Sequence, residues 1–189
     1  MAGSGSLTGM GRAFGRSPDG MAIHGVRFAR RYTFTPPFTG LGCDHRGFAA
    51  KQWVVGTLRQ LGHECIDFGT DDRHSVDYPD IAYMVAKAVV ETRVERAILV
   101  CSTGIGMPMA ANKIKGIRAT FCHDELSAHV ARQHICANVL CLSADHTEEV
   151  LMCRIIEVWL NTEAGGGRHR RRMKKIEAIE EGRDPRGIE

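Results

Sequence analysis

Strand-like and helix-like segments alternate from about residue 38 to the C-terminal region, and this alternation constrains the fold more than any other feature. The clearest strand is the run Ala97-Ile98-Leu99-Val100-Cys101, which is apolar without interruption, as in a parallel strand covered on both faces. A clear amphipathic helix follows residue 150, with Leu151, Ile155 and Trp159 at helical spacing. The alternation predicts an α/β fold, a parallel sheet with helices on both faces.

The pattern predicts five strands and the helices that connect them. We expect strands over residues 38–43, 63–68, 97–101, 118–122 and 139–143. We expect helices over residues 46–61, around 81–89, after the third strand up to 113, over 125–133, around 151–159 and over 168–181. In such a sheet the loops after the strands lie at one edge, so functional residues are expected there.

The chain divides into one folded domain and two terminal segments. Residues 37–182 form the predicted domain, and 183–189 a C-terminal tail. Residues 1–36 are rich in Gly, Ser and Arg, which is typical of a disordered extension and leaves an organelle transit peptide open. Residues 1–40 carry five Arg and one acid, so the rest of the chain is nearly neutral and nucleic-acid binding is not indicated. No apolar run approaches the roughly 20 residues that span a bilayer, so membrane insertion is not expected.

The chain has seven cysteines, and their pattern favours a reducing compartment. They form no CxxC pair and no Cys/His cluster with zinc-finger spacing, so no metal site is predicted. Most of them fall within apolar runs, where a thiol behaves as a small buried hydrophobe. A cytoplasmic location is the expectation, with organelle targeting by residues 1–36 left open.

The segment after the third strand carries the strongest chemical signal. Cys101 ends the strand, the turn Ser102–Gly106 contains two glycines, and Pro108 suits the first turn of a following helix. Backbone N–H groups in such a turn, with the helix N-terminus, can form an anion or oxyanion site. The same positive potential is expected to favour the thiolate of Cys101. Whether that thiolate acts as a nucleophile or a base is not decided by these residues.

Polar groups elsewhere fit the same site. Asp44 and His45 follow the first strand and are expected at the same edge, and Tyr78 precedes the second helical segment. Arg168 and Arg172 lie four residues apart on one helix face, an arrangement that suits a phosphate. Each group alone also has a purely structural explanation, as a cap, a packed ring or a solvated basic surface.

Four blocks of sequence resemble ribose-5-phosphate isomerase B in order and spacing. They are GCDHRGF (42–48), DYPD (77–80), CSTGIGMPMAANKIKGIRA (101–119) and GGRHRRRMKKI (166–176). The resemblance implies a Rossmann-like three-layer sandwich around a five-stranded parallel sheet, in a homodimer or tetramer whose active sites are shared between subunits. It also implies interconversion of ribose 5-phosphate and ribulose 5-phosphate in the pentose phosphate pathway, without a metal or other cofactor.

The resemblance assigns roles to individual residues. It implies that Cys101 is the base that moves a proton between C2 and C1, and that Thr103 assists proton movement between the two oxygens. The backbone of Ser102, Gly104, Ile105 and Gly106 would hold the enediolate. Asp44, His45 and Tyr78 would contact the sugar phosphate, Arg168 and Arg172 would grip its phosphate, and His134 would help open the furanose ring in the neighbouring subunit.

Two alternatives stay open at this point. After His134 the family usually has Asn, whereas this chain has Ile135-Cys136, so a six-carbon substrate such as allose or galactose 6-phosphate is the first alternative. The second is a non-catalytic phosphate-binding module. A module would explain the glycine turn but not the sets Asp44/His45 and Arg168/Arg172.

Overall fold

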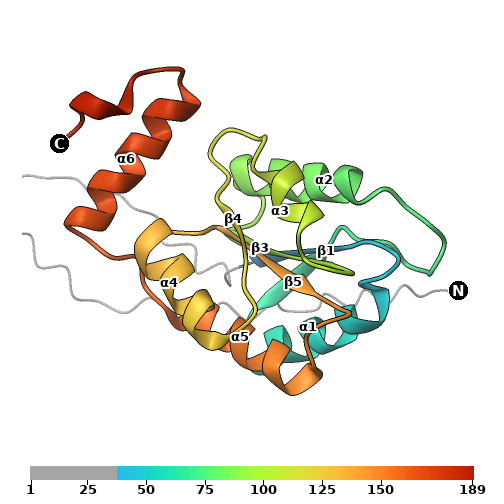
Figure 1. Ribbon diagram of the computed structural model, residues 1–189. Coiled ribbons are helices and arrows are strands. Elements are labelled where there is room, and N and C mark those ends of the chain that lie inside the picture. Colours follow the sequence, from blue (N-terminus) through green and yellow to red (C-terminus); the bar gives the residue numbers. More distant parts are fainter. Residues whose placement is uncertain (1–37) are drawn as a thin grey trace, which may run out of the picture. The chain divides into compact units, whose positions relative to one another are not determined.

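The computed structural model describes residues 38–189, so the predicted disordered or targeting segment 1–36 lies outside the described residues. The elements in chain order are β1 (Phe38–Cys43), α1 (Phe48–Gln60), β2 (Glu64–Asp67), α2 (Tyr78–Val90), β3 (Arg96–Cys101), α3 (Gly106–Ala111), β4 (Ala119–Phe121), α4 (Glu125–Ile135), β5 (Val139–Ser143), α5 (Glu149–Asn161), α6 (Arg168–Glu180) and the 3-10 turn η1 (Pro185–Gly187). Each predicted strand is found within two residues of its expected position, and each predicted helix is present (Figure 1).

The five strands form one parallel sheet in the order β2-β1-β3-β5-β4, which confirms the predicted α/β fold. β3 lies at the centre, and its run from Ala97 to Cys101 is buried along its whole length, as its unbroken apolar sequence predicts. Its neighbours are β1 and β5, with Val100 opposite Cys43 and Cys101 opposite Ser143. The ends of these three strands therefore meet at one edge, where the loop after each strand can share a site.

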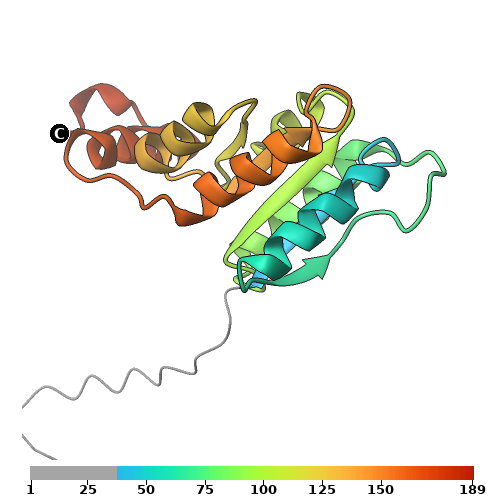
Figure 2. The same ribbon diagram turned by 90° about the horizontal axis from the view of Figure 1, so that it is seen from below.

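Helices cover both faces of the sheet, and each face has its own apolar core. One core packs α1, α4 and α5 against the sheet around Leu58, Leu140 and Trp159. The other packs α2 and α3 around Val85 and Met107. Figure 2 shows α1 and α5 side by side over the first face, so the central strands are shielded from water on both sides.

The helix after β3 ends earlier than the sequence predicts, at Ala111 rather than Lys113. The Asn112 side chain turns toward β4, where its amide donates to the Ala119 carbonyl at 2.8 Å and its oxygen accepts from the Ala119 N–H at 2.7 Å. Both bonds tie the end of α3 to the first residue of a strand. The backbone beyond Ala111 closes in tighter turns, in which the Lys113 N–H donates to the Ala110 carbonyl at 3.1 Å and the Ile114 N–H to the Ala111 carbonyl at 3.0 Å.

The last helix packs on the end of α4, away from the loops that follow β1 and β3 (Figure 1). A hydrogen bond from the Gly165 N–H to the Gln133 carbonyl, 2.8 Å long, fixes the approach to α6. Beyond α6, the Lys175 ammonium donates to the Pro185 carbonyl at 3.0 Å and holds the final turn against the helix. Among the residues that the structure describes, no helix has the length and apolar character to cross a membrane.

Candidate active site

Cys101 lies at the carboxyl end of β3 with only 5% of its surface exposed. The Gly104 N–H donates to its Sγ at 3.2 Å, and the amides of Met107 and Thr103 also interact with the sulfur. The turn therefore wraps its N–H groups around the thiol. A cluster of amides of this kind stabilises negative charge, which is the property predicted for this turn.

The turn takes this shape because of two glycines. Gly104 has a φ of +73°, and a side chain there would collide with the Phe121 ring at 2.5 Å. A side chain on Gly106 would meet the Tyr78 ring at 2.8 Å. Tyr78, itself 41% exposed, therefore lies directly against the turn, and its contact with a substrate stays a prediction.

The prediction that the thiolate of Cys101 is favoured is wrong for this chain taken alone. Burial raises the pKa of Cys101, and the neighbouring Asp44 carboxylate raises it further, while the amides of Gly104, Met107 and Thr103 lower it. The amide bonds limit the effect of burial, since Cys43 and Cys122, which lack such a cluster, have pKa values of about 11. The positive potential at the N-terminus of α3, a helix of six residues, does not outweigh the effect of burial on the pKa of Cys101.

Asp44 and His45 lie on the loop after β1, beside the end of β3, where the Asp44 N–H donates to the Val100 carbonyl at 3.2 Å. Asp44 is buried, and its Oδ1 accepts from the N–H groups of Arg46 and Gly47 at 2.9 and 3.0 Å. The His45 Nδ1 accepts from the Val76 N–H at 3.3 Å, so the segment before α2 is tied to the same loop. In the neutral ring this leaves the Nε2–H of His45 as a donor for a ligand.

The other residues of the turn divide by exposure. Thr103 and Ile105 are exposed, and the Ile105 N–H reaches the Thr103 hydroxyl at 3.4 Å. The Ser102 carbonyl instead faces β5, where it accepts from the Ser143 hydroxyl at 2.6 Å. Together, Asp44, His45, Tyr78 and residues 101–106 are called the Cys101 edge.

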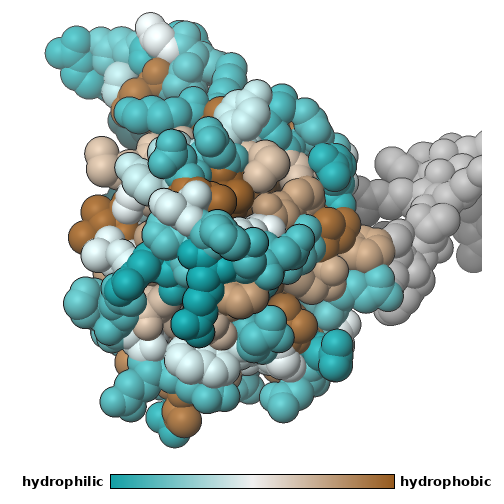
Figure 3. Space-filling model, turned by 90° about the vertical axis from the view of Figure 1, so that its right-hand side faces the viewer, coloured by the Kyte–Doolittle hydropathy of each residue, from teal (hydrophilic) through white to brown (hydrophobic). Residues whose placement is uncertain are grey.

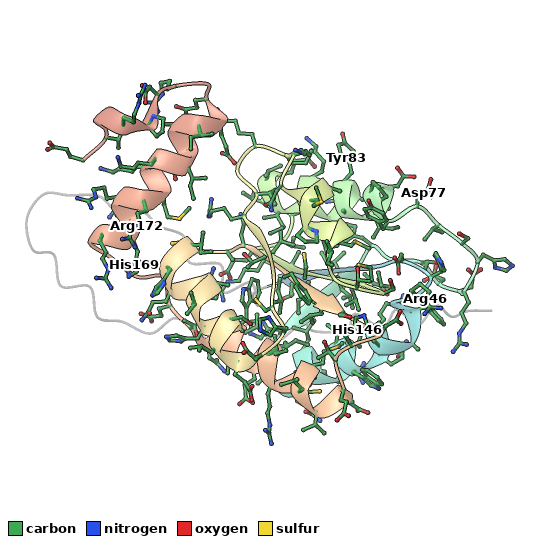
Figure 4. All side chains as sticks on the ribbon, viewed as in Figure 1. Arg46, Asp77, Tyr83, His146, His169 and Arg172 are labelled. Carbon is green, nitrogen blue, oxygen red and sulfur yellow. The ribbon has the colours of Figure 1, made fainter. Side chains whose placement is uncertain are left out.

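His134, Arg168 and Arg172 lie at the opposite end of the chain's own fold. Because α4 starts near the end of β4 and runs back along the sheet, its last turn brings His134 to the amino ends of the strands. Arg168 and Arg172 are exposed on α6, and within residues 38–189 neither forms an ion pair. Figure 4 shows Arg172 and His169 at one end of the protein and Arg46 and His146 at the other. We call His134, Arg168, His169 and Arg172 the α4–α6 end.

A stacked pair of histidines organises the α4–α6 end. The rings of His134 and His169 lie 4.0 Å apart, with 10° between their planes. Partial burial lowers the pKa of His169, and the charges of His134, Arg168 and Arg172 lower it further. His169 was not among the predicted residues, although it stands between the two predicted arginines in the sequence.

Sequence reasoning also missed a polar hollow beside the Cys101 edge. The hollow has a volume of about 410 Å³ and is lined by His45, Arg46, Ala49, Arg73 and Asp145. Arg46 and Asp145 form an ion pair of 2.9 Å across it. Asp145 lies two residues after the end of the fifth predicted strand, so the rule that strand ends share an edge could have found it. Figure 3, viewed toward this side of the protein, shows hydrophilic side chains gathered across the middle of the face.

Residues 38–189 contain no group of three or more His, Cys, Asp or Glu side chains placed to hold a metal ion. The carboxylate of Asp44 is occupied by backbone N–H groups, and the cysteines of the fold are separate and mostly buried. The polar groups that the Cys101 edge offers to a ligand are amide N–H groups, an imidazole and hydroxyls, a set suited to sugar oxygens and to phosphate.

Comparison with known proteins identifies close relatives. A model of the family described as Ribose/Galactose Isomerase matches residues 39–176. The chain is 43% identical over 143 residues to the ribose-5-phosphate isomerase B of Escherichia coli (strain K12), which covers 76% of this chain and 96% of that protein. The match extends over nearly all of the described domain.

Solved structures agree with this comparison. The ribose-5-phosphate isomerase B of Clostridium thermocellum superposes with a TM-score of 0.75 at 41% identity, covering 77% of this chain and 98% of that one. The Mycoplasma genitalium ribose-5-phosphate isomerase B, solved with bound ribulose-5-phosphate, superposes with a TM-score of 0.73 at 36% identity, covering 78% and 99%. Both likenesses cover the sheet and the helices on its two faces.

Proposed function

The chain belongs to the ribose/galactose isomerase family, and from this premise we propose that it interconverts ribose 5-phosphate and ribulose 5-phosphate at the Cys101 edge. Relatives named ribose-5-phosphate isomerase B, about 40% identical over most of the chain, make it an aldose–ketose isomerase. One observation carries the assignment of the site. Cys101 is the only side chain of the turn whose acid–base group lies inside a cluster of backbone amides.

In the proposed reaction, Cys101 in its thiolate form removes the proton from C2 of the open-chain sugar and returns it to C1. The hydroxyl proton on O2 moves to O1 with the help of Thr103, so atoms and electrons balance without a co-reactant. A single base suffices because both carbons are neighbours. The negative charge of the enediolate develops beside the amides of the turn, where fixed N–H dipoles stabilise it.

The second part of the proposal concerns the α4–α6 end. Cys101 ends β3, whereas His134 lies in the last turn of α4, and Arg168 and Arg172 lie on α6, which packs on α4. This separation along the sheet supports a role for the three residues at the Cys101 edge of another subunit. A second copy of the chain would supply them, with His134 opening the sugar ring and the arginines holding the phosphate. Two positive charges brought near Cys101 would also lower the pKa that burial has raised.

The test is an assay of purified protein in EDTA with ribose 5-phosphate, alongside the variant Cys101→Ala. Removal of a general base typically lowers the rate about 10²- to 10⁴-fold, and we expect a loss of this size in kcat. Cys153→Ala is the matched control, because Cys153 is a half-buried thiol on α5, outside the Cys101 edge.

Three outcomes decide the assignment. Turnover that Cys101→Ala abolishes and Cys153→Ala leaves intact supports the proposal. Turnover of allose 6-phosphate in place of ribose 5-phosphate would keep the mechanism and change the substrate. An active Cys101→Ala variant would rule Cys101 out as the base.

A further inference from the structure

The ion pair between Arg46 and Asp145 crosses the end of the central strand. Arg46 belongs to the loop after β1 and Asp145 to the loop after β5, and in the sheet these two strands flank β3. Their contact at 2.9 Å therefore passes over the carboxyl end of β3, which finishes at Cys101. An exposed ion pair elsewhere on the surface would have no such relation to a reacting group.

Hydrogen bonds fix both ends of this ion pair relative to Cys101. On the β1 side, the buried Asp44 carboxylate accepts from the Arg46 N–H at 2.9 Å. On the β5 side, the Asp145 N–H donates to the Ser102 carbonyl at 3.0 Å, and the Ala144 N–H donates to the Cys101 carbonyl at 2.8 Å. The backbone at both ends of the ion pair is thus fixed beside the turn, and the contact with Asp145 directs the Arg46 guanidinium across the end of β3.

The guanidinium still has donors to offer. Asp145 takes one of its five N–H groups, and the side chain of Arg46 is 58% exposed toward the hollow. Arg73 contributes a second guanidinium to the lining, and His45 contributes an imidazole N–H. Two guanidiniums against one carboxylate leave the hollow positively charged, which suits a phosphate dianion.

We infer that Arg46, positioned by Asp145, binds the phosphate group of the substrate from the same subunit that supplies Cys101. This inference rests on the proposed function, because it places the phosphate of a sugar phosphate in the hollow beside the Cys101 edge. Arg46 thereby joins Arg168 and Arg172 of a second copy as a phosphate ligand, and the phosphate is gripped from both chains.

The experiment compares Arg46→Ala with Arg154→Ala. Arg154 is a fair control because it is 64% exposed on α5, pairs with Glu125 and carries the same charge. Hydrogen bonds to charged groups predict that Arg46→Ala raises the KM for ribose 5-phosphate and the inhibition constant of inorganic phosphate about 10- to 100-fold. Arg154→Ala should change neither constant, and an equal effect of both variants would overturn the inference.

The positioning role of Asp145 is tested by a double-variant cycle. Asp145→Asn should change the inhibition constant of inorganic phosphate in the wild-type background but have a smaller effect in Arg46→Ala, because the residue acts through Arg46. Equal effects in both backgrounds would show that Asp145 does not act through Arg46.

The design separates this inference from the proposed function. If wild-type protein does not isomerise ribose 5-phosphate, the proposed function fails. Calorimetric binding of inorganic phosphate to wild type, Arg46→Ala and Arg154→Ala then still decides the role of Arg46. If wild type is active and Arg46→Ala binds phosphate as wild type does, only the inference about Arg46 fails.

Discussion

The Cys101 edge and the α4–α6 end both carry residues of the proposed site, but they are held in different ways. At the Cys101 edge, backbone N–H groups fix the two buried side chains: three amides surround the Sγ of Cys101, and the Asp44 carboxylate accepts from the loop that carries it. At the α4–α6 end, Arg168 and Arg172 are exposed and, within the described residues, form no ion pair. The first region holds a candidate base surrounded by N–H donors, and the second presents exposed cationic side chains that can bind an anion.

This difference indicates a division of labour. A general base needs a fixed position relative to two carbon atoms, and burial provides that position. Phosphate binding needs positive charge on side chains long enough to extend to the ligand, and exposed guanidiniums on a helix provide both. The burial that fixes Cys101 also raises its pKa, so the rigid region depends on positive charge from the other region to become reactive.

The largest effect is expected from the double variant Arg168→Ala/Arg172→Ala. Each guanidinium that binds phosphate contributes about 1.5–3 kcal/mol, so kcat/KM for ribose 5-phosphate should fall at least about 100-fold. Thermal stability should not change, since both side chains are exposed and unpaired within residues 38–189.

Arg171→Ala/Lys174→Ala is the matched control, because it removes two exposed positive charges from the same helix. If this control lost as much activity as Arg168→Ala/Arg172→Ala, the effect would be one of overall charge. Phosphate binding would then not distinguish Arg168 and Arg172 from the other cations of α6.

A smaller effect is expected in the pH dependence of thiol alkylation. Only the thiolate reacts, and burial raises the pKa of Cys101. In Arg168→Ala/Arg172→Ala, which lacks the arginines proposed to lower that pKa, the alkylation rate should therefore rise about tenfold per pH unit through the neutral range. Mass spectrometry of the peptide that contains Cys101 would follow the reaction. A rate that levels off near neutral pH in the Arg168→Ala/Arg172→Ala variant would contradict the raised pKa.

The smallest effect concerns the stack of His134 on His169. Aromatic pairs contribute about 0.5–1.5 kcal/mol, so His169→Ala should lower kcat/KM by about 2- to 10-fold, while His169→Phe keeps a stacked ring and should lose less. His129→Ala is the control, since His129 lies on α4, as His134 does, but contacts Thr162 instead of the stacked pair. Equal losses in Ala and Phe variants would mean that stacking does not orient His134.

The sequence predicted the fold well because its strands are short apolar runs between strong turn signals. The unbroken run from Ala97 to Cys101 marked the central strand, and the glycines after it marked the turn. The end of α3 was misplaced because the backbone after Ala111 turns more tightly, while the Asn112 side chain bonds to a strand that follows it in the chain. Periodicity carries no information about such a bond.

The site was predicted in part, and the limits have physical causes. Positions after strands are fixed by topology, so Asp44, His45 and Cys101 could be placed together from the sequence. The pKa of Cys101 could not be predicted, since it depends on the balance between burial and amide bonds. Topology could have placed Arg46 and Asp145 at the same edge, but it does not predict that these two side chains, 99 positions apart, form an ion pair.

Mixing two inactive variants tests most directly whether the two regions meet between chains. Cys101→Ala and Arg168→Ala/Arg172→Ala should each be nearly inactive alone. Refolded together, they should regain isomerase activity, because one site then combines an intact Cys101 edge with intact arginines from the other chain. Cys101→Ala mixed with His45→Ala should stay inactive, since both changes lie at the same edge. No recovery in the first mixture would contradict the account and place the whole site within one chain.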